Sequence, residues 1–257
     1  SAHVKYNKEN LIAIRITDPN GNFTWRDYEH FNWGKYQIMP SHGFGGITGK
    51  LIMEVTDPVY IRDVFVKNTL NAKEIEVEVE LSNKIAGELE FILSDNQSGE
   101  IIVSQKQTAS LNQPLLKKSI TCKKAKLWSP DHPHLYTITT KWKGADGSQD
   151  EFKRRFGFRS FEVKNVNGDR QFCLNGERIF LLSSISWSFW PVNGIRASDS
   201  WAKRQIETAK ALGLNMLNFH RAIGQPNVFD YADELGLLYY QEPGGYHNNF
   251  PNQSPEQ

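Results

Sequence analysis

Apolar and charged residues alternate most regularly between Glu74 and Leu81. Every second residue there is apolar and each residue between is a glutamate, which is the period-two signature of a β-strand with one buried and one solvated face. The glutamates are therefore expected to line the solvent-exposed face of the sheet and not to form a cation site. Similar patterns predict strands at Val59–Lys67, Glu88–Leu93, Glu100–Lys106, Leu115–Lys123, Leu135–Trp142 and Glu151–Arg159. About seven strands in roughly a hundred residues predict an all-β immunoglobulin-like sandwich over residues 57–156.

A different pattern begins near residue 180, where short apolar runs alternate with segments of helical periodicity. The runs Phe180–Ile185, Asn215–Phe219 and Leu237–Gln241 predict three strands, and the segments between them predict two helices. Strands and helices that alternate with short loops predict a parallel sheet with right-handed crossovers.

End signals define both predicted helices. Ser198 is a suitable N-cap and Gly213 a suitable stop for the first helix. Pro226 suits the first turn of the second helix, and Gly236 suits its end. The predicted apolar faces hold Trp201, Ile206, Ala209 and Leu212 in the first helix, and Val228, Tyr231, Ala232 and Leu235 in the second.

The carboxyl ends of parallel strands share one edge of the sheet, and folds of this kind bind their ligands at that edge. The residues that end or follow the three predicted strands carry hydroxyl, aromatic or charged side chains. We expect these residues to gather around one hollow: Ser186, Trp187, His220, Arg221 and Glu242.

The first 56 residues contain fewer signals. Alternation predicts strands at Asn10–Thr17 and Lys50–Val55. The glycine-rich stretch Gly43–Gly49 is interpreted as a structural turn, because it lacks the Lys-Ser/Thr pair and the helix of a phosphate-binding loop. Two strands are too few to close a sandwich, so we expect this segment to be part of a larger β-domain. Between the sandwich and the parallel unit, Asn175-Gly176 is the strongest hairpin signal.

Composition excludes several kinds of partner. The 30 Lys and Arg residues nearly balance the 29 Asp and Glu residues, so the chain has no large positive net charge that would attract nucleic acid or an anionic membrane. No apolar run is long enough to cross a bilayer. Cys122 and Cys173 are expected to be buried free thiols. His132 and His134 lack the clustered partners of a metal site, and no cofactor is expected. The sequence does not identify the compartment, although a periplasmic or secreted location is favoured.

Four separated stretches carry more specific information. They are Gly45-Gly46-Ile47; Leu127-Trp128-Ser129-Pro130 with Pro133-His134-Leu135-Tyr136; Phe156-Gly157-Phe158-Arg159 with Phe172-Cys173-Leu174-Asn175-Gly176; and Gly213-Leu214-Asn215 with Asp233-Glu234-Leu235-Gly236-Leu237. Together, and in this order, they resemble glycoside hydrolase family 2, which contains β-galactosidases, β-glucuronidases and β-mannosidases. The resemblance implies the end of a jelly-roll sugar-binding domain at residues 1–56, the immunoglobulin-like sandwich at 57–156, and the first βαβαβ portion of a (β/α)8 TIM barrel at 157–257.

The resemblance also implies a retaining glycosidase, whose mechanism needs two carboxyl groups about 5 Å apart. In the family these carboxylates follow the fourth and seventh barrel strands, and only three strands are predicted here. Both catalytic positions are therefore expected beyond Gln257, and the segment is expected to be inactive alone. The residues expected to contact a sugar are Trp187, Asn218, His220, Arg221 and Glu242.

The candidate sugar-binding residues depart from the family pattern at one place. Relatives carry Arg, and three residues later His, where this chain has Asn218 and Arg221. Either the altered pocket selects a different glycoside, or His220 and Arg221 contact the sugar in a new arrangement. Trp187 and Trp190 are candidates for stacking on a sugar ring, with anchoring of the loop as the alternative.

Two other functions are compatible with parts of the pattern. The chain is alternatively a non-catalytic carbohydrate-binding module in which the sandwich binds the sugar. A nucleotide-binding doubly wound domain is disfavoured, because the loop 186–197 lacks G-x-G-x-x-G and no acidic residue closes the second strand. Three parallel strands leave an open sheet edge. We therefore expect a homodimer through that edge, an incompletely ordered C-terminal unit, or packing of this unit against the sandwich.

Overall fold

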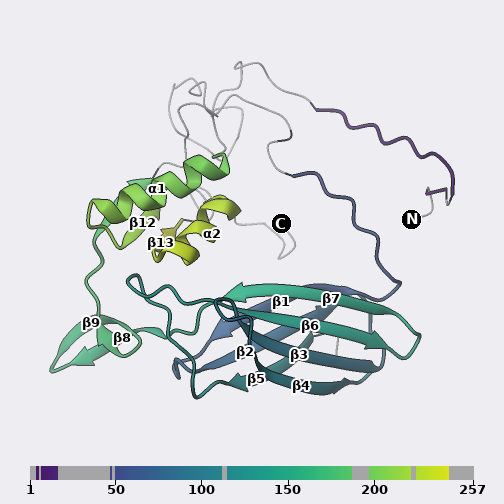
Figure 1. The fold of residues 1–257 in the computed structure, drawn as a ribbon, viewed down its shortest axis with the longest axis horizontal. Helices are drawn as coiled ribbons and strands as arrows, with labels where there is room; N and C mark the ends of the chain where they lie inside the picture. Colours follow the sequence, from purple (N-terminus) through teal and green to yellow (C-terminus); the bar gives the residue numbers. More distant parts are fainter. Residues whose placement is uncertain are drawn as a thin grey trace, which may run out of the picture.

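The computed structural model describes residues 4–5, 7–16, 47, 50–111, 115–186, 197–220 and 224–242. In this part of the chain a β-sandwich is followed by a β-hairpin and then by a short βαβαβ unit. The βαβαβ unit and the hairpin lie at one end of the sandwich (Figure 1). The fold is thus mostly β with few helices, in agreement with the mixed class expected from the sequence.

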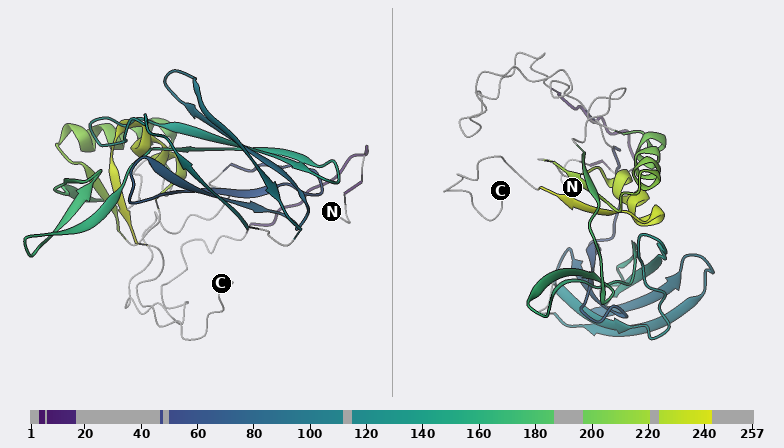
Figure 2. Two further views of the ribbon diagram at one scale, coloured as in Figure 1. Left: turned by 90° about the horizontal axis from the view of Figure 1, so that it is seen from below. Right: turned by 90° about the vertical axis from the view of Figure 1, so that its left-hand side faces the viewer.

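Seven antiparallel strands form the sandwich as two facing layers (Figure 2). One sheet has the order β1-β2-β5 and the other has the order β4-β3-β6-β7. Their bounds are β1 (Ile61–Asn68), β2 (Glu74–Leu81), β3 (Gly87–Asp95), β4 (Ile101–Ala109), β5 (Leu115–Thr121), β6 (Tyr136–Gly144) and β7 (Gln149–Phe156). Each strand predicted between residues 59 and 159 is confirmed within a few residues of its bounds.

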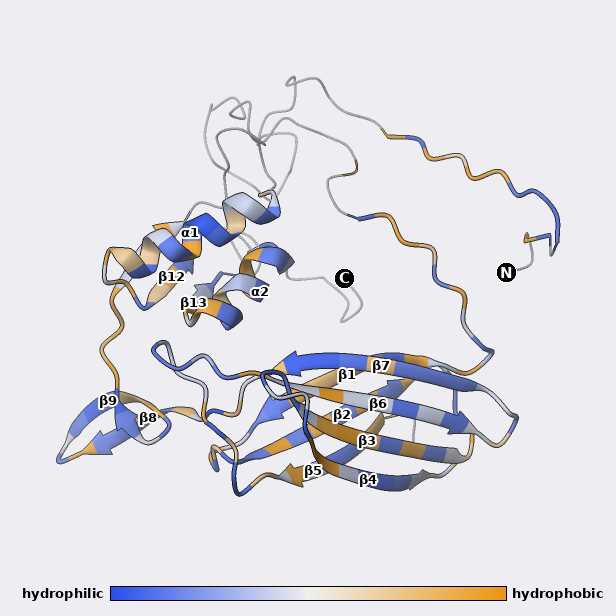
Figure 3. Ribbon diagram, in the orientation of Figure 1, coloured by the Kyte–Doolittle hydropathy of each residue, from blue (hydrophilic) through white to orange (hydrophobic). Residues whose placement is uncertain are grey.

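The core of the sandwich follows from the alternation along its strands. In β2, the side chains of Ile75, Val77 and Val79 are fully buried, while the glutamates between them point outward. Phe91 on β3 and Trp142 on β6 belong to the same buried cluster. The alternating orange and blue bands of Figure 3 show the same period on the ribbon. The inner face of the sheet is therefore buried, because every second side chain of its strands is apolar.

The outer face of the β1-β2-β5 sheet carries a ladder of opposite charges. Glu78 lies between Lys67 on β1 and Lys117 on β5, with N–O distances of 2.7 and 2.5 Å. The hydrogen bonds from Lys117 and then Lys67 lower the pKa of Glu78 to about 2. The glutamate run is thus an outward sheet face whose charges pair across the strands, as the pattern indicated.

A three-stranded hairpin sheet connects the sandwich to the βαβαβ unit. It consists of β8 (Phe161–Val166), β9 (Asp169–Leu174) and β10 (Glu177–Arg178). Asn175 and Gly176 have φ angles of 55° and 87°, the positive values that a tight two-residue turn requires, so the predicted hairpin is confirmed. The turn at Asn167 and Gly168, with φ angles of 53° and 88°, carries the same sequence signal, which the sequence analysis missed.

The βαβαβ unit is parallel throughout. Its elements are β11 (Ser183–Ser186), α1 (Asp199–Ala211), β12 (Met216–Phe219), α2 (Pro226–Leu235) and β13 (Leu238–Gln241). Ser186, Phe219 and Gln241 lie in register across the three strands. All three strands therefore end at the same edge, as the sequence predicted.

The predicted helix ends are confirmed. The Ser198 side chain accepts a hydrogen bond from the backbone N–H of Trp201, and Pro226 occupies the first turn of α2. Gly236 caps α2 in the left-handed conformation, with φ 80°. Gly213, with φ 79°, follows Leu212, the C-cap of α1.

The predicted apolar face of α1 was partly wrong. Ala202, Ile206 and Ala209 form its buried stripe, whereas Trp201 and Leu212 are 38% and 73% exposed. Spacings of four and three residues keep the buried set on one face. Trp201 and Leu212 lie five and six residues from Ile206, which places them on other sides of the helix. The face predicted for α2 is confirmed, since Val228 and Ala232 are buried and the others pack on the same cluster.

Polar contacts dock the βαβαβ unit on the sandwich. The indole N–H of Trp128 donates to the backbone carbonyl of Asp233 at 2.8 Å. The ammonium of Lys210 donates to the carbonyls of Pro130 and Gly236 at 2.6 and 2.9 Å. Gly236 has no room for a Cβ atom, because the carbonyl of Pro130 occupies that place. Of the arrangements expected for this unit, the structure shows packing against the sandwich.

Both strands predicted near the N-terminus are absent from the described residues. Residues 10–16 and 50–55 have no strand hydrogen bonding, and Leu11 and Val55 are 96% and 86% exposed. Alternation produces a strand only where a neighbouring strand accepts its hydrogen bonds, and no such neighbour is described beside these segments. The turn at 43–49 lies outside the described residues, apart from Ile47. The jelly-roll origin of residues 1–56 stays a prediction.

Replacement of Phe91 by Ala is expected to lower the free energy of unfolding by about 3–5 kcal/mol, because it leaves a cavity in a filled core. Urea unfolding measures the loss. Phe65→Ala on the outer face, where the ring is 54% exposed, is the control and is expected to cost less than about 1 kcal/mol. Equal losses in the two variants would contradict the assignment of the core.

Glu78→Gln is expected to lower the urea midpoint at pH 7 and to lose this effect in acid. The pKa of Glu78 is lowered in the folded protein, so its contribution to stability is present above its ordinary pKa and is lost as the pH falls toward about 2. Urea midpoints across this range measure the effect. Glu74→Gln on the same strand, whose carboxylate accepts from the hydroxyl of Thr121, is the matched control. A pH-independent difference between wild type and Glu78→Gln would refute the argument.

Candidate functional site

The carboxyl edge of the β11-β12-β13 sheet brings together residues that are far apart in the sequence. The backbone N–H of His220 donates to the carbonyl of Ser186 at 3.0 Å, and the N–H of Glu242 donates to the carbonyl of Phe219 at 3.4 Å. The backbone ladder thus continues one residue beyond β12 and β13. His220 and Glu242 are therefore held by sheet hydrogen bonds and not by loops alone.

An imidazole and a carboxylate meet at this edge. The Nδ1 atom of His220 lies 3.5 Å from an Oε1 oxygen of Glu242, and the two side chains are 22% and 33% exposed. Behind them, the amide of Gln205 on α1 donates to the hydroxyl of Ser186 at 3.0 Å. The structure thus brings together Ser186, His220 and Glu242, as the sequence predicted. Trp187, Trp190 and Arg221 lie outside the described residues.

Asn218 lies on the sheet face opposite the helices, one residue before the end of β12. Its register partners Ile185 and Tyr240 are more than half exposed. The Oδ1 atom of Asn218 is nevertheless buried and accepts no hydrogen bond within the described part of the protein. The side-chain oxygens of Gln205 and Gln241 are likewise buried and accept no hydrogen bond from the described residues. A buried acceptor without a donor costs free energy, so this edge carries polar groups that the described residues do not satisfy.

The described part of the edge can bind polar groups but lacks the set for hydrolysis. His220, Glu242 and Asn218 offer hydrogen-bond donors and acceptors at the ends of adjacent strands. Glu242 is the one carboxylate described there, whereas retaining hydrolysis needs two. No three His, Cys, Asp or Glu side chains of the described residues are grouped to hold a metal ion. In the same residues, no helix has both the length and the apolar character to cross a membrane.

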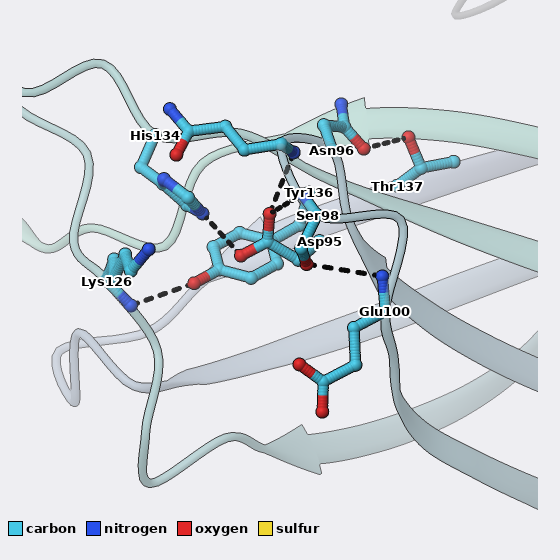
Figure 4. A network of polar contacts seen from close by, with 9 residues as sticks. Asp95, Asn96, Ser98, Glu100, Lys126, His134, Tyr136 and Thr137 are labelled. Atoms are coloured by element: carbon cyan, nitrogen blue, oxygen red, sulfur yellow. Dashed lines mark hydrogen bonds and ion pairs between the residues drawn. The ribbon is translucent and has the colours of Figure 1, made fainter.

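A second group of polar residues lies at the loop end of the sandwich (Figure 4). His134 and Asp95, both buried, are joined through Nε2 and Oδ2 at 2.8 Å. Although burial opposes it, the backbone N–H of Ser98 and the ring of His134 hold the pKa of Asp95 below its ordinary value. The hydroxyl of Tyr136 accepts from the backbone N–H of Lys126 at 2.8 Å. His134 thus serves an internal hydrogen bond.

Two clefts adjoin this group. One has a volume of about 390 Å³ and includes Asp95, Glu100 and Tyr136 in its wall. The other, of about 610 Å³, includes Asp131, His132 and Glu234. Gln97 and Lys126 line both. These clefts are not predictable from a local motif, because Asp95 and His134 are 39 residues apart in the sequence.

Comparison with known proteins identifies related chains. The model of the family "Glycosyl hydrolases family 2" matches residues 59–159. A β-galactosidase of Thermoanaerobacter pseudethanolicus is 26% identical in an alignment of 261 positions that covers 95% of this chain and 32% of that enzyme. A putative β-glucuronidase of Formosa agariphila is 26% identical over 217 aligned residues, which cover 80% of this chain and 20% of that protein. The chain thus spans a third or less of the length of these relatives.

Solved structures show the same fold. A glycosyl hydrolase family 2 member from Bacteroides cellulosilyticus superimposes with a TM-score of 0.62 at 26% identity, over 72% of this chain and 25% of the other. The β-glucuronidase of Parabacteroides merdae superimposes with a TM-score of 0.59 at 23% identity, over 71% of this chain and 23% of the other. The chain is therefore similar to part of the much longer glycoside hydrolase family 2 proteins, among them β-galactosidases and β-glucuronidases, and the family model itself matches its sandwich.

Proposed function

We propose that this chain is part of a retaining β-glycosidase and that the carboxyl edge of its parallel sheet contacts the sugar. In this proposal the sandwich is the immunoglobulin-like domain of the enzyme, and the βαβαβ unit opens its (β/α)8 catalytic barrel. The observation that carries the proposal is the parallel register of Ser186, Phe219 and Gln241, which brings His220 and Glu242 to one edge. Barrels of this kind bind substrates at the carboxyl ends of their strands.

The groups at the edge suit a hydroxyl-rich ligand. A sugar hydroxyl donates and accepts hydrogen bonds, and Glu242 and the Oδ1 atom of Asn218 are acceptors, while the ring of His220 serves either role according to its tautomer. Trp187 and Arg221 directly follow Ser186 and His220 in the sequence. We propose that Trp187 stacks on the sugar ring and that Arg221 donates to a hydroxyl or carboxylate.

Catalysis requires more than the described part of this edge contains. The retaining mechanism uses a nucleophile and an acid/base about 5 Å apart, and Glu242 is one carboxylate paired with His220. We therefore assign Glu242 to sugar binding, and propose that the parent protein supplies both catalytic carboxylates from outside these 257 residues. The β-galactosidase, β-glucuronidase and exo-β-D-glucosaminidase relatives support β-glycosides as the substrate class.

The exposed face of the parallel sheet is part of the same proposal. Ile185 and Tyr240 are 56% and 57% exposed on it. Exposed apolar side chains are stabilised when another protein surface packs on them. In the parent protein we propose that the remaining barrel strands cover this face. For the 257-residue chain we propose a homodimer through the open edge of this sheet, and light scattering that shows a monomer at all concentrations would rule the dimer out.

Ligand-observed NMR with methyl β-galactoside and methyl β-glucuronide tests the sugar site. We expect the chain to bind one of these sugars and to hydrolyse no nitrophenyl β-glycoside. His220→Ala and Glu242→Gln are expected to weaken binding at least about tenfold, the size of one lost charge-assisted hydrogen bond. Glu177→Gln on β10, far from the edge in the sequence, is the control. Unchanged binding in both edge variants would overturn the assignment, and hydrolysis by the purified chain would overturn the placement of the catalytic carboxylates.

The clefts of the sandwich favour a second candidate function, a non-catalytic carbohydrate-binding module. Both clefts are lined by Gln97 and Lys126, which provide donors for sugar hydroxyls. In the same NMR experiment this function predicts binding that survives His220→Ala and is lost in the double variant Gln97→Ala, Lys126→Ala. The reverse outcome favours the edge.

Asn218→Leu is expected to leave stability unchanged or to raise it by about 1 kcal/mol, because it removes a buried oxygen that has no donor in the described residues. Thermal unfolding measures the change. Asn215→Leu is the matched control. The Asn215 side chain bonds the carbonyl of Phe180 and the N–H of Leu182 at 2.7 and 2.8 Å, so its loss is expected to cost about 1–3 kcal/mol. An equal loss at Asn218 would indicate a structural amide.

A further inference from the structure

The hairpin sheet contains two turns with the same sequence and the same backbone. Asn167-Gly168 joins β8 to β9 and Asn175-Gly176 joins β9 to β10, each as a two-residue loop. The two asparagines have φ angles of 53° and 55°, and the two glycines have φ angles of 88° and 87°. A difference in reactivity between Asn167 and Asn175 must therefore come from their surroundings.

The side chain of Asn175 is held by two hydrogen bonds. Its Oδ1 atom accepts from the backbone N–H of Ser160, and its Nδ2 atom donates to the backbone carbonyl of Trp128, both at 3.0 Å. The backbone N–H of Asn175 also donates to the carbonyl of Ser160 at 2.8 Å. Asn175 is partly buried. Its side-chain amide thus cannot turn toward its own backbone unless both side-chain bonds break.

Asn167 lacks such restraints in the described part of the chain. It is exposed, and its side-chain amide makes no hydrogen bond with the described residues. A Cβ atom placed on Gly168 would meet no atom within 4 Å, so the space beside the Asn167-Gly168 peptide bond is open. The backbone N–H of Gly168 donates to the Oδ1 atom of Asn165 at 2.8 Å. Both of these residues are exposed, so water replaces this bond at little cost.

The two turns also differ in their place in the fold. The hairpin of β8 and β9 projects from the rest of the protein (Figures 1 and 2), whereas the Asn175 turn is bonded to Trp128, which is 1% exposed. Exposed turns open locally at a small fraction of the free energy of global unfolding. Asn167 is therefore expected to reach open conformations far more often than Asn175 while the rest of the chain stays folded.

An Asn-Gly pair can react with its own backbone, because glycine has no side chain to shield its nitrogen. The backbone nitrogen of Gly168 gives its proton to hydroxide and attacks the Cγ atom of Asn167. A bond from this nitrogen to Cγ forms, the bond from Cγ to Nδ2 breaks, and the Nδ2 group takes a proton from water and leaves as ammonia. Water then opens the resulting succinimide ring at either carbonyl and leaves aspartate or isoaspartate.

We propose that Asn167 is a site of self-modification that deamidates in the folded protein, whereas the hydrogen bonds of Asn175 protect it until the protein unfolds. The reaction needs only water and hydroxide, and it is independent of the ligand that the strand edge binds. Isoaspartate adds a carbon atom to the backbone, and a two-residue turn of this type has no place for it. The modification therefore disturbs the pairing of Val166 with Asp169.

Peptide mapping of the full chain tests the proposal. Trypsin cleaves after Lys164, Arg170 and Arg178, so each asparagine falls in its own peptide, which mass spectrometry quantifies after incubation in mildly alkaline buffer. We expect Asn167 to be lost at least about tenfold faster than Asn175, since two side-chain hydrogen bonds must break at Asn175. In urea at the same pH the two rates are expected to become similar, because the dipeptides are identical. Equal rates in the folded protein, including no reaction at either site, or a difference that persists in urea, would overturn the proposal.

The products and a pair of variants test the route. Cyclisation predicts isoaspartate together with aspartate, each carrying one heavy oxygen atom after incubation in heavy-oxygen water. Aspartate alone would indicate direct hydrolysis and would contradict cyclisation. Asn167→Gln is expected to abolish the modification, because its longer side chain closes a ring more slowly. Asn165→Gln in the same peptide is the matched control and is expected to leave the modification in place, since the branched side chain of Val166 shields the nitrogen that follows Asn165. Loss of the reaction in Asn165→Gln instead would refute the assignment to Asn167.

Discussion

The insertion of Trp128 between the sandwich and the second helix is the contact on which the arrangement of this chain depends. The indole is buried, bonded to the carbonyl of Asp233 and covered by the guanidinium of Arg159. In the described part of the chain the two apolar cores are separate clusters on either side of this boundary. Interfaces that are small and polar permit relative motion of the units that they join, so the position of the strand edge depends on a few polar contacts and not on a continuous core.

The two units owe their internal stability to different periodicities. In the sandwich, a period of two residues buries Ile75, Val77 and Val79 and leaves glutamates for pairing with lysines. In the βαβαβ unit, α1 and α2 cover one face of the parallel sheet, while the opposite face exposes Ile185 and Tyr240. The sandwich is therefore covered on its inner faces by its own strands. Among the described residues the parallel sheet is covered on one face, by α1 and α2, and in the relatives the matched segment is a small part of a longer chain.

Most elements of the fold could be predicted from the sequence, because their signals are local. Alternation located the seven sandwich strands, and Ser198, Pro226 and Gly236 located the helix ends. The same signals gave wrong predictions where the local structure or burial depends on a partner far away in the sequence. Residues 10–16 alternate without forming a strand. Trp201 is apolar, but its position on α1 places it away from the core. At the site, register placed His220 and Glu242 correctly. The buried Oδ1 atom of Asn218, which has no donor among the described residues, and the pair of Asp95 with His134 depend on residues far apart in the sequence, so no local pattern predicts them.

Gly236 meets two requirements at once. Its backbone adopts φ 80°, and the carbonyl of Pro130 occupies the space of a side chain. A substitution at this position is thus unfavourable for two reasons. The backbone would keep a positive φ angle, and the new side chain would overlap a loop more than a hundred residues earlier in the chain. A substitution that relieves only the backbone conformation leaves the overlap. Evolutionary change at residue 236 is therefore tied to change in the loop at residue 130, and the two units are expected to diverge together at this point.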